Sequence, residues 1–389
     1  MSLLATKFLP FHQAFIGEEE IRSVAEVMRS GWLTSGPRAK EFEACFARFV
    51  GAEHAVAVNS CTAALHLALA AIGLQEGEEV ILPTMTFAAS AEVVLYFKAR
   101  PVLVDCINGS FHMDPAEIER AVTSRTRAVV PVHYGGYPCE MDSILEIARR
   151  NKMKVIEDAA HAMPSRYKGK MIGAIGDITC FSFYATKTLT TGEGGMATTE
   201  NQEYAERMRR LSLHGISKDA WKRYTAEGSW KYDIAEAGYK YNLPDLQAAI
   251  GLVQLGKCHA MQARRREIAE QYTEELETLE GFTAPATASD EGHAWHLYVV
   301  HVNSAALRIR RDQVIEELKN RGIGTSVHFI PLHLHSLYQR HLGYREGQFP
   351  NAEERFSGAI SLPLYPGMDD ADVGRVIEAL RDVNREFIR

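Results

Sequence analysis

Lys187 lies in the stretch Gly176 to Met196 (GDITCFSFYATKTLTTGEGGM), whose composition favours a reactive amine. The residues at 178–183 (ITCFSF) are mostly β-branched or aromatic and are typical of a buried strand, and the glycines that follow suit a backbone that bends tightly or approaches a ligand. A lysine is normally a solvated surface group. At the end of a buried strand, however, its amine loses water, which lowers the pKa and makes it a usable Schiff-base nucleophile. Both interpretations of Lys187 stay open on this stretch alone.

A carboxylate that could work with this lysine ends the apolar run KVIED at 154–158 and is followed by small residues. Asp158 would lie at the carboxyl end of a parallel strand, where open α/β sheets bind their ligands. A common alternative is that the aspartate caps the N-terminus of a following helix. The chemical interpretation is that Asp158 keeps the ring nitrogen of pyridoxal phosphate (PLP) protonated, so that the ring acts as an electron sink.

Together, the motifs VIEDAAHA (155–162) and GDITCFSFYATKTLTTGEGG (176–195) closely resemble those of the DegT/DnrJ-type sugar-nucleotide aminotransferases, which are fold-type I PLP enzymes. The resemblance covers almost the whole chain. It implies that Lys187 forms the Schiff base with the cofactor and carries the proton between the substrate and cofactor carbons. It also implies that Asp158 pairs with the ring nitrogen and that His161 contacts the phenolic oxygen of the cofactor.

A phosphate site is indicated by the segment AVAVNSCTAA at 55–64, which suits a strand, a turn of small residues and the start of a helix. Such a helix start aims backbone N–H groups and the helix dipole at an anion, although it could equally cap a buried helix. The resemblance places Cys61 and Thr62 at the cofactor phosphate, with Ser182 beside them. The family more often has Gly-Thr at the positions of Cys61 and Thr62. A cysteine in place of the glycine keeps the backbone N–H donors for the phosphate.

A second phosphate ligand is implied by the motif GYKYNLPDLQAAIGLVQL at 238–255. By resemblance, Asn242 crosses the subunit interface to the phosphate of a partner's cofactor, which implies a homodimer with shared active sites. From the residues alone, Asn242 would cap the helix that Pro244 begins.

Three further residues are candidates on the substrate side. Phe87 is either a core aromatic or, by resemblance, a lid stacked on the pyridine ring. Thr34 lies in SGWLTSGP (30–37), a loop that approaches the active site in the family, and His328 lies in SVHFIPLH (326–333). The histidines of this last motif and of HAWHL (293–297) could suggest zinc. No carboxylate or cysteine falls beside them at a metal-ligand spacing, so no metal is expected.

The totals exclude several classes of protein. The 389 residues carry a net charge of −7 and have no basic stripe, which argues against a nucleic-acid partner. No apolar run is long enough to cross a membrane, and no signal peptide is evident. The six cysteines are scattered without CxxC spacing, which favours reduced core thiols and a cytoplasmic location.

The elements that must position these residues alternate between strand and helix at intervals of about 25–30 residues, which predicts an α/β fold with a mainly parallel sheet and helices on both faces. We expect a large PLP-binding domain with an N-terminal arm at 1–250 and a smaller α+β domain at 251–389. A long helix at 244–279 would link them, and strands at 295–302 and 324–329 would flank a helix at 311–321. Residues 216–238 show no clear periodicity.

The resemblance implies that an amino group moves from L-glutamate, which becomes 2-oxoglutarate, to a nucleotide-linked keto-sugar. Within the family, segments such as LPFHQAFIGEEEI and RGIGTSVHF are similar to those of the enzymes that aminate a UDP-linked 4-keto-pentose for lipid A modification, whereas Phe87 and FYATK depart from them. UDP-linked 4-keto-6-deoxy-hexosamines and dTDP- or GDP-linked 4-keto-hexoses stay open. Some relatives are sugar dehydratases with histidine in place of the Schiff-base lysine, and Lys187 counts against that alternative. A DNA-binding regulator would need a helix-turn-helix signal, which we do not find.

Overall fold

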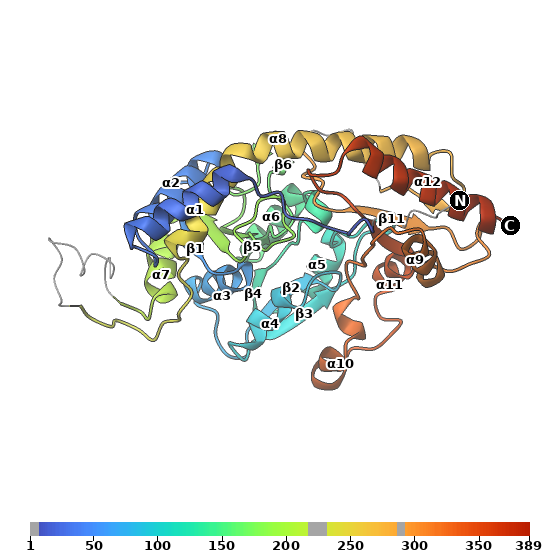
Figure 1. Cartoon of the computed structure of the whole chain (residues 1–389). Helices are drawn as coiled ribbons and strands as arrows, with labels where there is room; N and C mark the ends of the chain where they lie inside the picture. The colour runs from blue at the N-terminus through green and yellow to red at the C-terminus, as the bar shows by residue number, and fades with distance from the viewer. Residues whose placement is uncertain (1–7, 217–231, 286–291) are drawn as a thin grey trace.

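The computed structural model describes residues 8–216, 232–285 and 292–389, and its largest sheet has seven strands (Figure 1). Their order across the sheet is β1-β9-β8-β5-β4-β2-β3. β9 runs antiparallel to both of its neighbours, whereas all other pairs are parallel. The strands are β1 (His54–Val58), β2 (Glu79–Pro83), β3 (Arg100–Val104), β4 (Thr126–Val129), β5 (Lys154–Asp158), β8 (Ile178–Ser182) and β9 (Gly195–Thr199). The mainly parallel sheet confirms the predicted α/β fold.

Helices cover both faces of this sheet because its strands are buried on both sides. Successive side chains of a strand point to opposite faces. In β2, Val80 and Leu82 therefore join one core cluster, while Ile81 joins another. The first cluster lies under α3 (Cys61–Ala71), α4 (Ala89–Leu95) and α7 (Gln202–Ser212). The opposite face is covered by α2 (Pro37–Val50), α5 (Pro115–Ala121), α6 (Met141–Arg150) and part of α8 (Asp245–Leu276).

The C-terminal part has a small antiparallel sheet in the order β10-β11-β12, packed on helices. Its strands are β10 (Phe282–Thr283), β11 (Tyr298–Val302) and β12 (Ala359–Leu362), and its helices are α9 (Arg311–Asn320), α10 (Ser336–Leu342), α11 (Pro350–Gly358) and α12 (Asp370–Phe387). The predicted strand at 324–329 is wrong. This segment forms only an isolated bridge from Ser326 to Ser361, and the carbonyl oxygen of His328 accepts a hydrogen bond from the Tyr134 hydroxyl instead of joining a ladder.

Helix α8 spans the length of the molecule, from α1 (Glu18–Ser30) and α2 at one end to α12 at the other (Figure 1). It matches the helix predicted at 244–279. The division predicted at residue 250 falls inside α8, and it stays a prediction. Most of the stretch without periodicity lies at 217–231, outside the described residues.

The N-terminal segment before α1 crosses to the C-terminal part of the fold (Figure 1). There the backbone of Leu9 pairs with the strand-like turn at 322–324, with hydrogen bonds of 2.8 Å in both directions. Among the described residues, none of the helices combines the length and the apolar character that a membrane span requires.

Candidate active site

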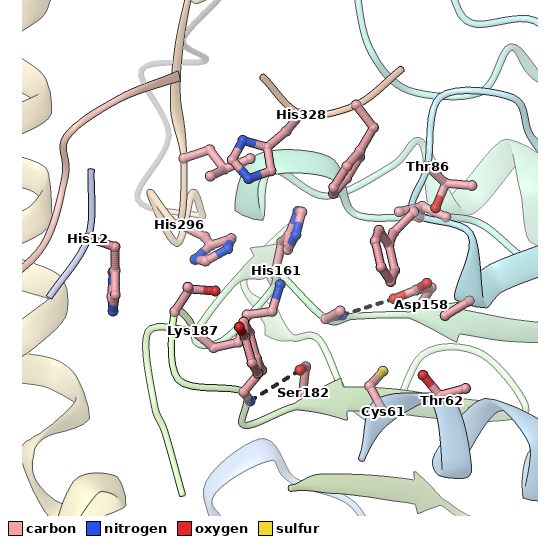
Figure 2. A pocket seen from close by; sticks show the side chains of 18 of the residues that line it. His12, Cys61, Thr62, Thr86, Asp158, His161, Ser182, Lys187, His296 and His328 are labelled. Atoms are coloured by element: carbon pink, nitrogen blue, oxygen red, sulfur yellow. Dashed lines mark hydrogen bonds between the residues drawn. The ribbon is translucent and has the colours of Figure 1, made fainter. Parts of the chain in front are cut away.

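A pocket of about 540 Å³ lies beside the carboxyl ends of β5 and β8 (Figure 2). Neighbouring parallel strands end at the same edge of a sheet, so the residues that follow them converge. The pocket brings together eight of the ten residues predicted for the site, namely Cys61, Thr62, Phe87, Asp158, His161, Ser182, Lys187 and His328.

Lys187 lies on the loop that follows β8, and its side chain enters the middle of the pocket (Figure 2). A tight turn holds the loop, since the backbone N–H of Lys187 donates to the carbonyl oxygen of Tyr184 at 2.9 Å. Burial lowers the pKa of Lys187 to about 8, even though the nearby Asp158 carboxylate favours the charged amine. A substantial fraction of the amine is therefore neutral near pH 8 and able to attack a carbonyl carbon. The interpretation as a solvated surface lysine is wrong.

Asp158 is the last residue of β5, and only 5% of it is exposed. One carboxylate oxygen, Oδ2, accepts a hydrogen bond from the Ser90 hydroxyl at 2.7 Å, and Oδ1 accepts one from the backbone N–H of Ala160 at 3.1 Å. The helix-cap interpretation is wrong, because the chain after β5 continues in turns to the hairpin β6–β7 (Arg166–Tyr167 and Lys170–Met171). The carboxylate therefore faces the pocket without a helix to cap.

His161 has its tautomer fixed by a backbone group. The N–H of Gly135 donates to Nδ1 of His161 at 3.2 Å, so Nδ1 is the acceptor and the proton of the neutral ring is on Nε2. Burial, followed by the charges of Lys187 and His328, lowers the pKa of His161 well below its usual value. The ring is consequently neutral near pH 7 and offers a single N–H donor.

The turn between β1 and α3 lies at one end of the pocket. The Ser60 hydroxyl accepts the backbone N–H of Ala63 at 3.1 Å and so caps α3, which leaves other N–H groups of the first turn available to an anion. Cys61 and Thr62 begin this helix. The backbone of β9 lies very close to this turn: a Cβ on Gly195 would lie 2.5 Å from the carbonyl carbon of Ser60. Burial and the Asp158 carboxylate raise the pKa of the Cys61 thiol, which stays protonated.

Phe87 and His328 lie on different segments of the pocket wall. Phe87 is 61% exposed, so its interpretation as a core aromatic is wrong, whereas its role as a lid stays a prediction. Its ring centroid lies 5.7 Å from that of Phe329. Nδ1 of His328 is 2.8 Å from the hydroxyl of Ser361, and burial lowers the pKa of His328 to about 4.

Thr34 and Asn242 do not line this pocket. They lie near one another on a different part of the surface, where the amide nitrogen of Asn242 donates to the Ser35 hydroxyl at 2.7 Å. The carbonyl oxygen of Thr34 accepts the backbone N–H of Asp245 at 3.2 Å. Asn242 is not the cap of α8, since Pro244 holds that position. The prediction that Asn242 serves a partner subunit is not tested by a single chain.

Sequence reasoning missed several residues of the wall, above all two histidines. His12 reaches the pocket from the N-terminal segment, and its Nε2–H donates to the carbonyl oxygen of Ala185 at 2.9 Å, two residues before Lys187. His296 is 6% exposed, and within the described part of the chain its Nδ1 has no hydrogen-bond partner. Figure 2 shows His296 close to His161 and Lys187. The only signal was that both residues belong to motifs shared with the family, LPFHQAF and HAWHL.

The donors in this pocket fit PLP. The pocket combines an amine with a pKa of about 8, a buried carboxylate, a single imidazole N–H donor and a helix start crossed closely by a glycine. Lys187, Asp158 and His161 could hold the aldehyde, ring nitrogen and phenolic oxygen, and the start of α3 could hold the phosphate. Within residues 8–216, 232–285 and 292–389, no group of three or more His, Cys, Asp or Glu side chains is arranged to hold a metal ion.

Comparison with known proteins gives consistent matches along the chain. A model of the DegT/DnrJ/EryC1/StrS aminotransferase family matches residues 14–381. The spore coat polysaccharide biosynthesis protein SpsC of Bacillus subtilis is 52% identical over 377 residues, which are 97% of each chain. The structure of Spr1654 of Streptococcus pneumoniae in its PLP form is 34% identical, with a TM-score of 0.90 and coverage of 97% of this chain and 99% of that one. Helicobacter pylori PseC, an aminotransferase involved in the biosynthesis of pseudoaminic acid, is 27% identical, with a TM-score of 0.91 and coverage of 98% and 100%.

Proposed function

The chain belongs to the DegT/DnrJ/EryC1/StrS aminotransferase family and is a PLP-dependent sugar aminotransferase, and we propose that it moves an amino group from L-glutamate to a nucleotide-linked keto-sugar. The observation that carries the proposal is that Lys187 and Asp158 line one pocket at the ends of two neighbouring parallel strands. The first choice of acceptor is a UDP-linked 4-keto-sugar, on the strength of the motifs shared with enzymes that aminate such sugars. dTDP- and GDP-linked 4-keto-hexoses are the alternatives.

The names of two relatives support a role in making surface carbohydrate. SpsC is a protein of spore coat polysaccharide biosynthesis, and PseC takes part in the biosynthesis of pseudoaminic acid. We therefore propose that the aminated sugar is built into a cell-surface polysaccharide or into lipid A. All six cysteines are unpaired thiols, which supports the reducing cytoplasm as the place of the reaction.

Three residues of the pocket have proposed roles in the chemistry. When bound, PLP supplies an electron sink for the charge that develops on the carbon bearing the amine. Lys187 anchors the cofactor covalently through Nζ, and the freed amine then takes a proton from one carbon and returns it to the other. Asp158 holds the ring nitrogen in its protonated form, and the Nε2–H of His161 donates to the phenolic oxygen.

Other residues have proposed roles in binding and orienting the cofactor and the substrate. The first turn of α3, with Cys61 and Thr62, holds the phosphate together with the Ser182 hydroxyl, by neutral donors and the helix dipole. Phe87 covers the face of the ring and excludes water from it. Asn242 completes the phosphate site of a second subunit, so that the active unit is a homodimer. His328 and Thr34 are proposed to contact the sugar substrate, although Thr34 does not line the pocket of its own chain.

A panel of nucleotide keto-sugars tests the proposal directly. The holoenzyme is mixed with L-glutamate and one UDP-, dTDP- or GDP-linked 4-keto-sugar, and 2-oxoglutarate is measured by a coupled assay while mass spectrometry follows the sugar. We expect equal amounts of 2-oxoglutarate and amino sugar with a UDP-linked member, and neither with Lys187→Ala. A sugar product without 2-oxoglutarate would instead identify a dehydratase. Turnover with simple keto acids but with no nucleotide sugar would refute the proposed acceptor.

A further inference from the structure

Two buried hydroxyl groups, of which Thr86 itself lines the pocket, form a chain that ends on Asp158. Oγ1 of Thr86 lies 2.8 Å from Oγ of Ser90, and Oγ of Ser90 lies 2.7 Å from Oδ2 of Asp158. The exposed fractions are 1% for Thr86, 0% for Ser90 and 5% for Asp158. Water therefore does not replace these hydrogen bonds, and each partner depends on the next one.

The direction of the hydrogen bonds follows from the chemistry of the groups. An ionised carboxylate only accepts, so the single proton of the Ser90 hydroxyl is donated to Asp158. The bond between the two hydroxyls is then donated by Thr86 to Ser90. Both protons point toward the carboxylate, and hydrogen bonds aligned in this way polarise and strengthen one another in a poorly solvated interior. The chain fixes the orientation of the Asp158 carboxylate.

The same hydroxyls tie Asp158 to the turn that carries Phe87. Thr86 and Phe87 lie on the turn between β2 and α4, and Ser90 lies in the first turn of α4, where its backbone N–H donates to the carbonyl oxygen of Phe87 at 3.2 Å. The turn is anchored at its other end as well, because the Thr84 hydroxyl is 2.7 Å from Nδ1 of His333. Two parts of the pocket lining, the Asp158 carboxylate and the backbone that carries the Phe87 ring, are therefore held in one hydrogen-bonded unit.

We propose that Ser90, and Thr86 acting through it, are positioning residues that hold the Asp158 carboxylate oriented for the ring nitrogen of the cofactor. The inference rests on the proposed role of Asp158. Its consequence is that the two hydroxyls help to set how tightly the enzyme holds PLP, although neither contributes to the covalent link. Two hydroxyls that merely satisfied each other's hydrogen bonds in the core would have no such effect.

The test measures the dissociation constant of PLP from the apo-enzyme by titration of the visible absorbance of the bound cofactor. Removing a hydrogen bond to a buried charged group costs enough to raise the dissociation constant about tenfold or more, and this is the result expected for Ser90→Ala. Ser90→Thr keeps the hydroxyl and should stay within about threefold of the wild type. Thr86→Val should lie between these two variants.

A matched control removes a buried hydroxyl elsewhere. Thr198 is 0% exposed and donates to the carbonyl oxygen of Gly173 at 2.7 Å, away from the pocket. Thr198→Val should lower the melting temperature of the apo-enzyme and leave the dissociation constant of PLP unchanged. If Ser90→Ala does not fold, judged by its melting temperature, the comparison of Thr86→Val with Ser90→Thr decides the question.

A double-mutant cycle separates this inference from the proposed function. With Asp158→Asn already present, adding Ser90→Ala should change the dissociation constant by less than about threefold, because a residue that acts through Asp158 has nothing left to act on. An equal effect of Ser90→Ala in both backgrounds, or no effect in the wild type, overturns the inference. An unchanged dissociation constant for Asp158→Asn alone instead overturns the proposed role of Asp158.

Discussion

The ring centroids of His161 and His296 lie 4.4 Å apart, although His161 follows β5 of the large sheet and His296 precedes β11 of the small one. The turn at Gly135 and Gly136 lies between the two segments and hydrogen-bonds to both of them. Gly135 donates to Nδ1 of His161 and accepts from Leu297, and Gly136 accepts from Ala294. The turn at Gly135 and Gly136 thus joins the C-terminal segment at 294–297 to the segment that carries His161, and it packs closely against both.

This close approach predicts that Gly136→Ala is destabilising. The glycine has a φ of +96°, and a Cβ on it would lie 2.8 Å from the carbonyl oxygen of His161 and 2.9 Å from Cβ of Ala294. Backbone strain and overpacking together should lower the free energy of unfolding by about 2 kcal/mol or more, as measured by urea denaturation of the apo-enzyme. Gly135→Ala is the matched control. Its φ is +65° but its nearest contact is at 3.8 Å, so we expect a loss of only about 1 kcal/mol. Equal losses for the two variants would contradict the packing argument.

The lowered pKa of Lys187 predicts how the attachment of PLP depends on pH. Only the neutral amine attacks the aldehyde, so the attachment rate should rise with pH around a midpoint of about 8 and then level off. A lysine with an ordinary pKa of about 10.4 would give a rate that still rises at pH 10. Stopped-flow absorbance of apo-enzyme mixed with PLP measures this profile. Borohydride trapping and peptide mapping should then place the cofactor on Lys187, and an adduct on another lysine would refute the assignment.

The sequence predicted best those site residues that end a buried strand. Asp158 ends the apolar run that forms β5, Lys187 lies on the loop after β8, and the parallel pairing of these strands brings the two residues to one edge of the sheet. A motif of neighbouring residues carries that information. His12 and Ser90 could not be predicted in this way, because each is a single polar residue that reaches its partner only through the tertiary fold. The strand predicted at 324–329 failed for a related reason, since Ser326, His328 and Phe329 line the pocket and the segment joins no ladder beyond the bridge at Ser326.

Buried neutral histidines predict a loss of stability in acid. His66 is 6% exposed, its Nδ1 lies 3.0 Å from the Tyr241 hydroxyl, and burial lowers its pKa from 6.5 to about 4. As the pH falls below 6.5, the unfolded chain binds a proton at this residue before the folded chain does. The stability it contributes is therefore complete above pH 6.5 and is lost as the pH falls toward 4.

The variant His66→Gln isolates that contribution. Between pH 6 and pH 5, the free energy of unfolding of the wild type should fall more steeply than that of the variant, by up to about 1.4 kcal/mol per pH unit. Above pH 7 the difference between the two proteins should be constant. Urea denaturation of the apo-enzymes at a series of pH values gives both quantities. Parallel curves over the whole range would show that His66 is not a neutral group that charges on unfolding.

Asn242 provides the sharpest test of a shared active site. Its side chain lies outside the pocket of its own chain and donates to Ser35, and we predict that it completes the pocket of a second subunit. Lys187→Ala and Asn242→Ala should each be inactive or nearly so as pure proteins. When subunits of the two variants exchange at random, half of the dimers are mixed and each mixed dimer has one intact site, so activity should recover to about a quarter of the wild type.

The control mixes Lys187→Ala with Asp158→Ala, two changes within one pocket. This mixture should recover activity only if the two residues of one site came from different chains. We therefore expect no recovery in the control, because each site of the mixed dimer lacks either Lys187 or Asp158. The same lack of recovery in the test mixture would refute a shared site. The discriminating measurement is the tandem chain in which one subunit carries both Lys187→Ala and Asn242→Ala beside a wild-type partner. In a shared site that arrangement leaves both sites damaged, one lacking Lys187 and the other lacking Asn242, and activity should be lost, whereas an unshared site would leave the wild-type subunit with about half of the normal activity.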